Sequence, residues 1–280
     1  MILYKFLDTK KANKFIENQR LYFTPPIFFN DLQDCSACID ISEILCKKNT
    51  KEYLRYVRRF YNRYLQQNPF ERITLQKFEE KLQKPNFIKR IFENDINNKN
   101  LNIREILSNM YVICSLSEFW SENLMWSHYA SKHKGICIGI NFDDQFIKSM
   151  IIKKVKYVSL DEKPIVPYLF LYKIDDEKQR KILRKVIFTK TTNWKYEDEF
   201  RFLSEKDYCK QEKRVTEEGK DCIYYYKQLK IDTIKEIYIG ANSNYSLKTI
   251  QDWKKKFNKD INFYKIVESL QSYKLDRKIL

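Results

Sequence analysis

Glycine, histidine and long apolar runs are scarce in this chain of 280 residues. Only four glycines occur, at positions 135, 139, 219 and 240, too few and too scattered for either common glycine-rich phosphate loop. No apolar run approaches the ~20 residues that span a bilayer. The first residues, MILYKFLDTKK, lack the apolar core and cleavage site of a signal peptide. We therefore expect a soluble, cytoplasmic protein with no membrane partner.

Zinc ligands and paired cysteines are also few. The seven cysteines are an odd number without regular spacing, which does not indicate a secreted disulfide framework. Cys35 and Cys38 form the single CxxC, but the only histidines, His128 and His133, lie far away in sequence. Because a zinc site needs about four ligands, we expect reduced thiols packed as small hydrophobic side chains and no metal.

Positive charge, by contrast, is abundant. The chain has 53 basic and 37 acidic residues, a formal net charge of +16, and a hydrophobic fraction of 43% that excludes disorder as the main state. Such an excess favours a phosphate-bearing partner, either nucleic acid or a nucleotide. It can also reflect genomic bias, since asparagine, isoleucine and tyrosine are abundant too, and composition leaves both explanations open.

Apolar periodicity predicts an α+β protein, organised as a single domain over residues 1–280. We expect a helix over 8–18 with Asp8 as its N-cap, another over 175–190, and a final one after Ser246. Apolar and aromatic residues at helical spacing predict a helical insertion at about 41–110, with its basic faces outward. Strands are predicted at ILYKFL, RLYFTPP, YVICSLS, GICIGINF, IKKVKYV, WKYEDEFRFLS, CIYYYKQL, IKEIYIGAN and INFYKIV.

The stretch NWKYEDEFRF, residues 193–202, places carboxylates among aromatic residues. If 194–203 is a strand, Glu197, Glu199 and Arg201 share one face, and Phe200 lies on the opposite face toward the core. The two carboxylates then lie about 7 Å apart. This spacing suits one carboxylate that stabilises a cationic transition state and another that deprotonates a nucleophile. The alternative is an exposed strand face on which Arg201 is the counterion.

A second block, LMWSHYASKHKGICIGINF at 124–142, combines a histidine with aromatic residues. His128 is a candidate acid, base or phosphate ligand, and Trp126 and Tyr129 are candidates for stacking on a ligand ring. The alternative is a hydrogen-bonded core histidine. We expect this block to lie near the two glutamates in space.

Four blocks resemble the bacterial domain-of-unknown-function 2971 family. They are LYKFLDTKKANKFIENQRLYFTPPIFFND, VICSLSEFWSENLMWSHYASKHKGICIGI, WKYEDEFRF and IKEIYIGANSN, in this order. The resemblance covers most of the chain except the helical insertion near 41–105. The MWSHYAxxHKGICIG and WxYExExR patterns are its most specific parts, and the family name implies no reaction.

The order of the blocks is similar, more remotely, to that of ADP-ribosyltransferases, especially those that modify nucleic acid. The resemblance implies a split, bent mixed β-sheet and NAD as a substrate. It implies Glu199 as the catalytic glutamate, Glu197 as the group that orients or deprotonates the acceptor, and His128 as an accessory group on the pyrophosphate. The residues that it implies for contacts to NAD are Lys5, Tyr4, Ser115, Ser117, Trp126, Tyr129 and Arg201.

The leading hypothesis is therefore an NAD-dependent ADP-ribosyltransferase that modifies nucleic acid or protein. The resemblance implies a bacterial toxin or phage-defence effector, with an antitoxin or regulatory protein as a partner. One alternative is a nuclease that uses His128 with Glu197 or Glu199, or the glutamates as metal ligands. Another is a non-catalytic protein that binds nucleic acid or a partner. NAD binding separates the first hypothesis from the others, and inhibition by a chelator would indicate the metal nuclease.

Overall fold

The structure is a computed structural model that describes residues 1–40, 51–82, 84, 86–87, 90, 103–167, 177–215, 219, 221–257 and 260–280. The chain divides into two compact units. The first unit comprises Met1–Cys35, Leu107–Glu162 and Ile187–Leu280, and the second comprises Ser36–Ile106 and Lys163–Val186. The interpretation of residues 1–280 as one domain stays a prediction.

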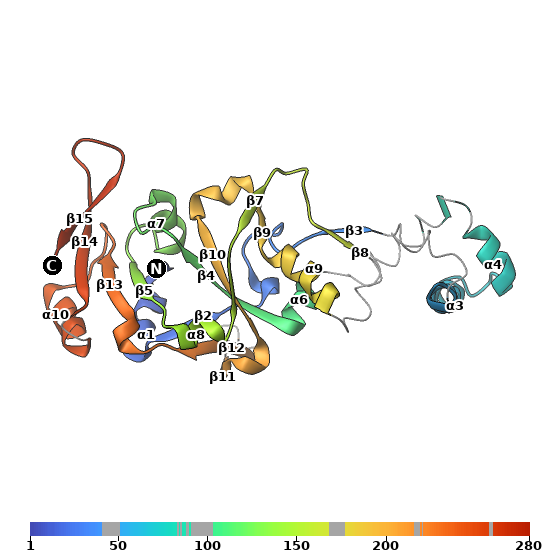
Figure 1. The fold of residues 1–280 in the computed structure, drawn as a ribbon, viewed down its shortest axis with the longest axis horizontal. Helices are drawn as coiled ribbons and strands as arrows, with labels where there is room; N and C mark the ends of the chain where they lie inside the picture. Colours follow the sequence, from blue (N-terminus) through green and yellow to red (C-terminus); the bar gives the residue numbers. More distant parts are fainter. Residues whose placement is uncertain are drawn as a thin grey trace. The chain divides into compact units, whose positions relative to one another are not determined.

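An eight-stranded sheet forms the centre of the first unit (Figure 1). β13 and β14 are parallel, and all other neighbouring strands of this sheet are antiparallel. The α+β class and the large mixed sheet are thus confirmed, whereas the ADP-ribosyltransferase type of the fold stays a prediction. In spatial order the strands are β15 (Leu275–Ile279), β14 (Asn262–Glu268), β13 (Ile234–Ile239), β5 (Ile136–Asn141), β1 (Ile2–Leu7), β4 (Tyr111–Ser117), β10 (Glu199–Glu205) and β6 (Ile151–Lys154).

Side chains on both faces of this sheet are buried, because successive residues of a strand point to opposite faces. On β5, Ile136 and Ile138 belong to one core cluster and Cys137 to another. The first cluster includes side chains of α1 (Thr9–Asn18) and α10 (Leu247–Lys256), and the second includes side chains of α7 (Asn123–Tyr129). The central strands therefore read as nearly continuous apolar runs.

The helix starts that we predicted from capping residues are confirmed. The Asp8 carboxylate accepts a hydrogen bond from the Lys11 backbone N–H at 2.8 Å, at the start of α1. The Ser246 hydroxyl accepts one from the Thr249 backbone N–H at 3.1 Å, at the start of α10. Each bond satisfies a donor that the first helical turn leaves unpaired. A further short helix is α8 (Asp144–Lys148), and short 3₁₀ turns are η1 (Pro26–Phe28), η4 (Lys206–Tyr208) and η5 (Ile231–Thr233).

A second, three-stranded antiparallel sheet has the order β11 (Lys210–Val215), β12 (Asp221–Gln228) and β2 (Arg20–Phe23). Leu21, Phe23 and Tyr225 point into the main core. The sequence analysis missed β11 and β15, because their charged residues show no apolar alternation. Both strands are held by backbone pairing at the edge of a sheet.

The predicted strand over 194–203 is only partly correct. Thr192–Glu197 is a 3₁₀ helix, η3, and β10 begins at Glu199. Between them Asp198 has a φ of 39°, a left-handed conformation that aspartate tolerates better than most residues do, and that ends the turn. The predicted strand IKKVKYV is also divided, into β6 and β7 (Lys156–Val158). β7 pairs with β9 (Thr189–Thr191) in a separate sheet.

The second unit contains the helices that were predicted for the insertion at about 41–110. α3 (Lys51–Gln67) and α4 (Leu75–Lys81) pack through aromatic rings, with Tyr61 and Tyr64 against the fully buried Phe78. Arg55 and Arg58 are exposed, as expected for an outward basic face. Parts of the insertion, 41–50 and 91–102, lie outside the described residues. The remaining elements are β3 (Cys38–Asp40), which pairs with β8 (Ile165–Pro167), and two helices at the division between the units, α6 (Ile103–Met110) and α9 (Glu177–Ile187).

Two of the four glycines lie where backbone segments come into direct contact. A Cβ on Gly135 would lie 2.1 Å from the Leu7 carbonyl oxygen, and one on Gly240 would lie 2.2 Å from the His133 carbonyl oxygen. These glycines allow the loop after α7 to lie against β1 and the end of β13. Within the described ranges, no helix is long and apolar enough to cross a membrane.

Candidate active site

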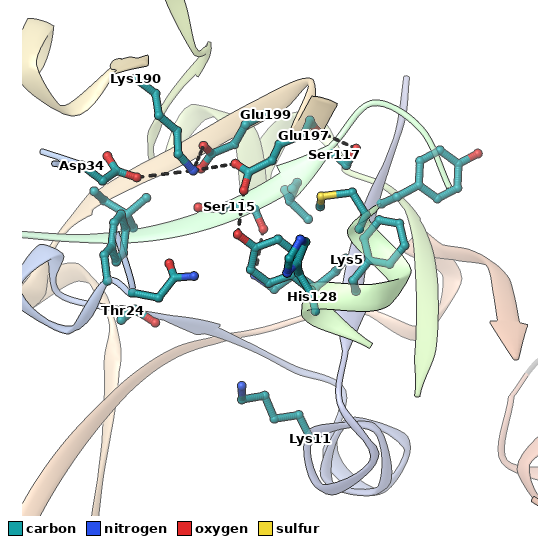
Figure 2. A pocket seen from close by; sticks show the side chains of 18 of the residues that line it. Lys5, Lys11, Thr24, Asp34, Ser115, Ser117, His128, Lys190, Glu197 and Glu199 are labelled. Atoms are coloured by element: carbon teal, nitrogen blue, oxygen red, sulfur yellow. Dashed lines mark hydrogen bonds and ion pairs between the residues drawn. The ribbon is translucent and has the colours of Figure 1, made fainter. Parts of the chain in front are cut away.

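A cavity of about 390 Å³ lies in the first unit, within the range of small-molecule sites (Figure 2). β1, β4, β9, α7 and the junction of η3 with β10 contribute to its walls, together with the segment after β2. Its polar and charged lining residues are Tyr4, Lys5, Lys11, Thr24, Asn30, Asp34, Ser115, Ser117, His128, Tyr129, Lys190, Glu197 and Glu199.

Arg201 joins two of the carboxylates that line this cavity, those of Asp34 and Glu199. Its Nε and Nη2 donate to the Glu199 carboxylate at 2.8 and 3.0 Å. Its Nη1 and Nη2 donate to the Asp34 carboxylate at 2.9 and 2.6 Å. The alternation of β10 places Glu199 and Arg201 on one face, so that each carboxylate meets one edge of the planar guanidinium. Arg201 itself has no exposed surface.

Lys190, on β9, is the second cation of this buried group. Its Nζ lies 2.6 Å from Glu197 Oε2 and 3.5 Å from oxygens of both Asp34 and Glu199. It also lies 4.6 Å from the centre of the Trp194 ring. Figure 2 shows its side chain reaching between the three carboxylates. Three carboxylates and two cations leave one negative charge in excess, and we call these five residues, Asp34, Lys190, Glu197, Glu199 and Arg201, the acidic network.

The pKa values of the two glutamates move in opposite directions. Burial acts to raise the pKa of Glu199, but Arg201 and Lys190 outweigh it and lower the value to about 2. Burial raises the pKa of Glu197, and the neighbouring Glu199 raises it further, while Lys190 opposes both. Glu199 is therefore ionised throughout the physiological range, whereas Glu197 is the carboxylate that gains a proton more readily. Two carboxyl groups with divergent pKa values are typical of acid–base sites.

Neighbouring hydroxyl groups fix the positions of both glutamates. The Tyr129 hydroxyl donates to Glu197 Oε1 at 2.6 Å, and the Ser117 hydroxyl donates to the Glu197 backbone carbonyl at 2.8 Å. The Tyr157 hydroxyl accepts a hydrogen bond from the Glu199 backbone N–H at 2.9 Å. Burial and the charge of Glu197 raise the pKa of Tyr129, so it stays a neutral donor.

Cations line another part of the cavity. The Lys5 ammonium donates to the Ser115 backbone carbonyl at 2.7 Å. The Lys11 ammonium forms a salt bridge with Asp8 at 2.8 Å, and its side chain is 71% exposed. Figure 2 shows Lys11 well apart from the two glutamates. The cavity is thus acidic where Glu197 and Glu199 meet and basic toward α1.

A second cavity, of about 170 Å³, shares part of its lining with the first. The residues common to both are Lys5, Phe6, Lys11, Thr24 and Tyr129. The second cavity continues to Arg20 and Tyr22 on β2.

Most of the residues singled out from the sequence meet in the larger cavity: Glu197, Glu199, His128, Lys5, Tyr4, Ser115, Ser117 and Tyr129 all line it. The expected proximity of the histidine block to the glutamates is confirmed. The alternative prediction, that the glutamates lie on an exposed strand face, is wrong, since Glu197 and Glu199 are only 4% and 3% exposed.

Two predicted ligand contacts are wrong. Trp126 was expected to stack on a ligand ring, but it is fully buried in the core, where its Nε1 donates to the Trp120 carbonyl at 2.7 Å. It packs edge-on against Phe6. Arg201 was expected to contact NAD, but it lies beneath the cavity lining, with its guanidinium engaged by Asp34 and Glu199. Arg201 is therefore the buried counterion of Asp34 and Glu199.

The sequence analysis missed Asp34 and Lys190. Asp34 lies beside the CxxC, and Lys190 ends the stretch that was predicted as the helix 175–190. An aspartate in a turn and a lysine after a helix are usually solvated, so no local signal marked either residue. Only the tertiary contacts of Arg201 and Glu197 bring them into the network.

The cysteines show no metal-binding arrangement in the described part of the chain. Cys35 is buried beside Arg201, with its Sγ 3.6 Å from Nη1, and burial raises its thiol pKa. Cys38 is exposed, and both thiols are free. No group of three or more histidine, cysteine, aspartate or glutamate side chains that could hold a metal ion occurs among the residues with described positions.

Part of the site lies in a segment that matches a known protein family. Residues 125–202 match the model of a family described as "Protein of unknown function (DUF2971)", which supports the resemblance expected from the sequence over this segment. The matched segment contains His128, Tyr129 and four residues of the acidic network. We find no match to the chain among curated proteins or among solved structures.

Proposed function

We propose that this protein is an NAD-dependent ADP-ribosyltransferase and that the larger cavity is its active site. One observation carries the proposal. Two buried carboxylates, Glu197 and Glu199, have pKa values that diverge, and they line a small-molecule cavity that also presents Lys5 and Lys11.

The charge distribution of the cavity suits the two charged parts of NAD. The positive charge of its nicotinamide ring moves to the ribose as the glycosidic bond breaks, and the acidic network carries one excess negative charge. Its pyrophosphate is an anion, and Lys5 and Lys11 supply ammonium groups that can hold phosphate oxygens as point charges. His128 lines the same cavity and can donate a hydrogen bond to a phosphate.

Glu199 is the residue that we assign to stabilisation of the cationic transition state. Arg201 and Lys190 keep it ionised and hold its position, so its charge needs no reorganisation during the reaction. A carboxylate accepts about four hydrogen bonds. The two that Arg201 donates leave lone pairs that can accept from a ribose hydroxyl.

Glu197 is the residue that we assign to deprotonation of the acceptor. The C–N bond between ribose and nicotinamide breaks, and nicotinamide leaves with the bonding electron pair. The acceptor oxygen or nitrogen forms the new bond to the anomeric carbon, and its proton passes to the Glu197 carboxylate. A raised pKa makes Glu197 a better base for this step than Glu199. Tyr129 positions Glu197 through its 2.6 Å hydrogen bond.

The test is release of nicotinamide from NAD, with transfer of labelled ADP-ribose to nucleic acid or lysate protein measured in parallel. Removing the charge of Glu199 by Glu199→Gln should lower the rate a hundredfold or more, since such a group supplies about 3–4 kcal/mol. Glu17→Gln, at an exposed position on α1, is the matched control and should keep the wild-type rate. Wild-type protein without nicotinamide release or label transfer would contradict the proposal, and inhibition by a chelator would favour a metal nuclease.

A biological readout follows from the same proposal. An enzyme of this kind would act as a toxin or phage-defence effector, as the remote family resemblance implies. Expression of the wild type in bacterial cells should then slow growth, and Glu199→Gln at equal abundance should not.

A further inference from the structure

One face of the three-stranded sheet carries tyrosine and basic residues. On β2, Leu21 and Phe23 point into the core, so Arg20 and Tyr22 lie on the opposite face. The register places further residues on that same face. We call the set Arg20, Tyr22, Lys210, Glu212, Arg214, Tyr224 and Tyr226 the tyrosine–arginine face.

The planar groups of this face pack on one another. The Arg20 guanidinium carbon lies 4.3 Å from the centre of the Tyr226 ring. The Arg214 guanidinium carbon lies 4.7 Å from the centre of the Tyr224 ring and 5.1 Å from that of Tyr22. Tyr224 is 37% exposed. The face therefore presents stacked planar groups at a surface, where a further planar group can add to the stack.

One carboxylate fixes both guanidinium groups. Glu212 accepts from Arg20 Nη1 at 3.0 Å and from Arg214 Nε at 2.6 Å. Two arginines and Lys210 share the face with this single carboxylate, so the tyrosine–arginine face has a positive excess. A positive excess beside aromatic rings is complementary to nucleic acid, whose bases stack on such rings and whose phosphates bind the cations.

The tyrosine–arginine face leads to the active-site cavity along β2. Arg20, Tyr22 and Thr24 alternate on the same side, and Thr24 lines the larger cavity, whereas all three line the smaller one. At about 3.3 Å per residue, the four steps from Arg20 to Thr24 cover roughly 13 Å. A nucleic-acid strand lying on the face therefore lies beside the smaller cavity, which shares Lys5, Thr24 and Tyr129 with the cavity that the glutamates line.

We propose that the tyrosine–arginine face binds single-stranded nucleic acid and holds it as the acceptor, an inference that rests on the proposed function for the chemistry. Bases that are unstacked and splayed can add to the Tyr–Arg stacks, whereas bases inside a duplex cannot. The acceptor's oxygen or nitrogen forms the bond to the anomeric carbon as the nicotinamide bond breaks, and its proton passes to Glu197.

The test is direct binding, measured without NAD by fluorescence anisotropy of labelled oligonucleotides. The probes are a mixed-sequence single-stranded RNA of about 20 nucleotides, the DNA of the same sequence, and the corresponding DNA duplex. We expect single strands to bind at least tenfold more tightly than the duplex. The single-stranded probe that binds more tightly identifies the acceptor as RNA or DNA.

Matched variants separate stacking from general electrostatic attraction. Tyr224→Ala should weaken single-strand binding about fivefold to a hundredfold, the range of base–aromatic stacking, whereas Tyr224→Phe should retain it. Tyr273→Ala, which removes a fully exposed tyrosine between β14 and β15, is the control and should bind like the wild type. Lys210→Gln should remove about one phosphate contact. The slope of log affinity against log salt should then fall in magnitude by about one.

Equal affinity for duplex and single strands, or unchanged single-strand binding by Tyr224→Ala, would overturn the inference. Thermal melting of each variant shows whether weaker binding reflects unfolding, and Tyr224→Phe supplies a folded variant with the ring intact. Binding needs no NAD, so its failure is distinguishable from failure of the proposed reaction, which nicotinamide release by the wild type reports.

Discussion

Replacing Arg201 by lysine should destabilise the first unit strongly, although the charge is conserved. Arg201 donates four hydrogen bonds to Asp34 and Glu199 across its planar fork. A lysine ammonium is a point charge without that fork, so it cannot contact both carboxylates along both edges. At least two of the four bonds are then lost inside a site with no solvent exposure.

The expected loss can be estimated from these contacts. A hydrogen bond to a charged group contributes about 1.5–3 kcal/mol, so two lost bonds give about 3–6 kcal/mol, a range that includes the cost of breaking a buried ion pair. At about 2–4 °C per kcal/mol for a large domain, the melting temperature should fall by roughly 6–24 °C. Circular dichroism during heating, with urea unfolding as a second measurement, gives both quantities.

Arg214→Lys is the matched control, because Arg214 also pairs with a carboxylate but lies at the surface with a side chain 22% exposed. Surface ion pairs contribute about 0–1 kcal/mol. A melting temperature for Arg201→Lys that lies within 2 °C of the control, where ~2 °C corresponds to less than about 1 kcal/mol, would refute the idea that the bidentate contacts stabilise the fold.

The remaining predictions concern pH and the core. Because protonated Glu197 cannot act as a base and its pKa is raised, transfer should fall as the pH drops through a range above the ordinary glutamate value of 4.5. Tyr129→Phe removes a hydrogen bond that favours the ionised form, so the acidic limb of the pH–rate profile should move to higher pH; an unmoved limb would exclude Glu197 as the base. The pKa of Glu199 is lowered to about 2 from 4.5, so its ionisation stabilises the folded state above pH 4.5, and this contribution is lost as the pH falls toward 2. Acid unfolding followed by circular dichroism should therefore show a shallower loss of stability over this range in Glu199→Gln than in the wild type. In the core, Phe202→Ala should cost about 3–5 kcal/mol in urea unfolding, since Phe202 is 1% exposed, while Phe200→Ala should destabilise less, because Phe200 is partly exposed at the edge of the same cluster.

Much of the fold was predictable because local patterns and tertiary packing agree. The short apolar runs ILYKFL and GICIGINF indicate strands whose two faces meet two cores, and the polar caps Asp8 and Ser246 mark helix starts. The pattern around 194–203 was misleading for a physical reason. Its alternation continues through Asp198, but the left-handed backbone there separates a 3₁₀ turn from a strand. Periodicity cannot detect a single residue with unusual dihedral angles.

The candidate site was predictable where residues lie in dense aromatic and charged blocks, and not elsewhere. Glu197, Glu199 and His128 lie in two such blocks, and the cavity brings these together. Asp34 and Lys190 come from stretches with no distinctive pattern, because what matters is their position around Arg201 and Glu197. Trp126 shows the opposite error: it lies in a distinctive block beside a histidine, but its side chain packs in the core and does not line the cavity.

The separation of Asp34 from Arg201 in the chain has a consequence for synthesis. The two residues are 167 positions apart, and at about 5–20 residues added per second Arg201 follows Asp34 by roughly 8–33 s. During that interval the Asp34 carboxylate has no guanidinium partner and must stay hydrated, because an unpaired charge is too costly to bury. The nascent chain can therefore close its charged centre only after β10 has left the ribosome. A polypeptide that stalls before β10 would contain the earlier residues that line the cavity but neither Glu199 nor Arg201. Any chemistry at this cavity therefore has to wait until translation is well advanced.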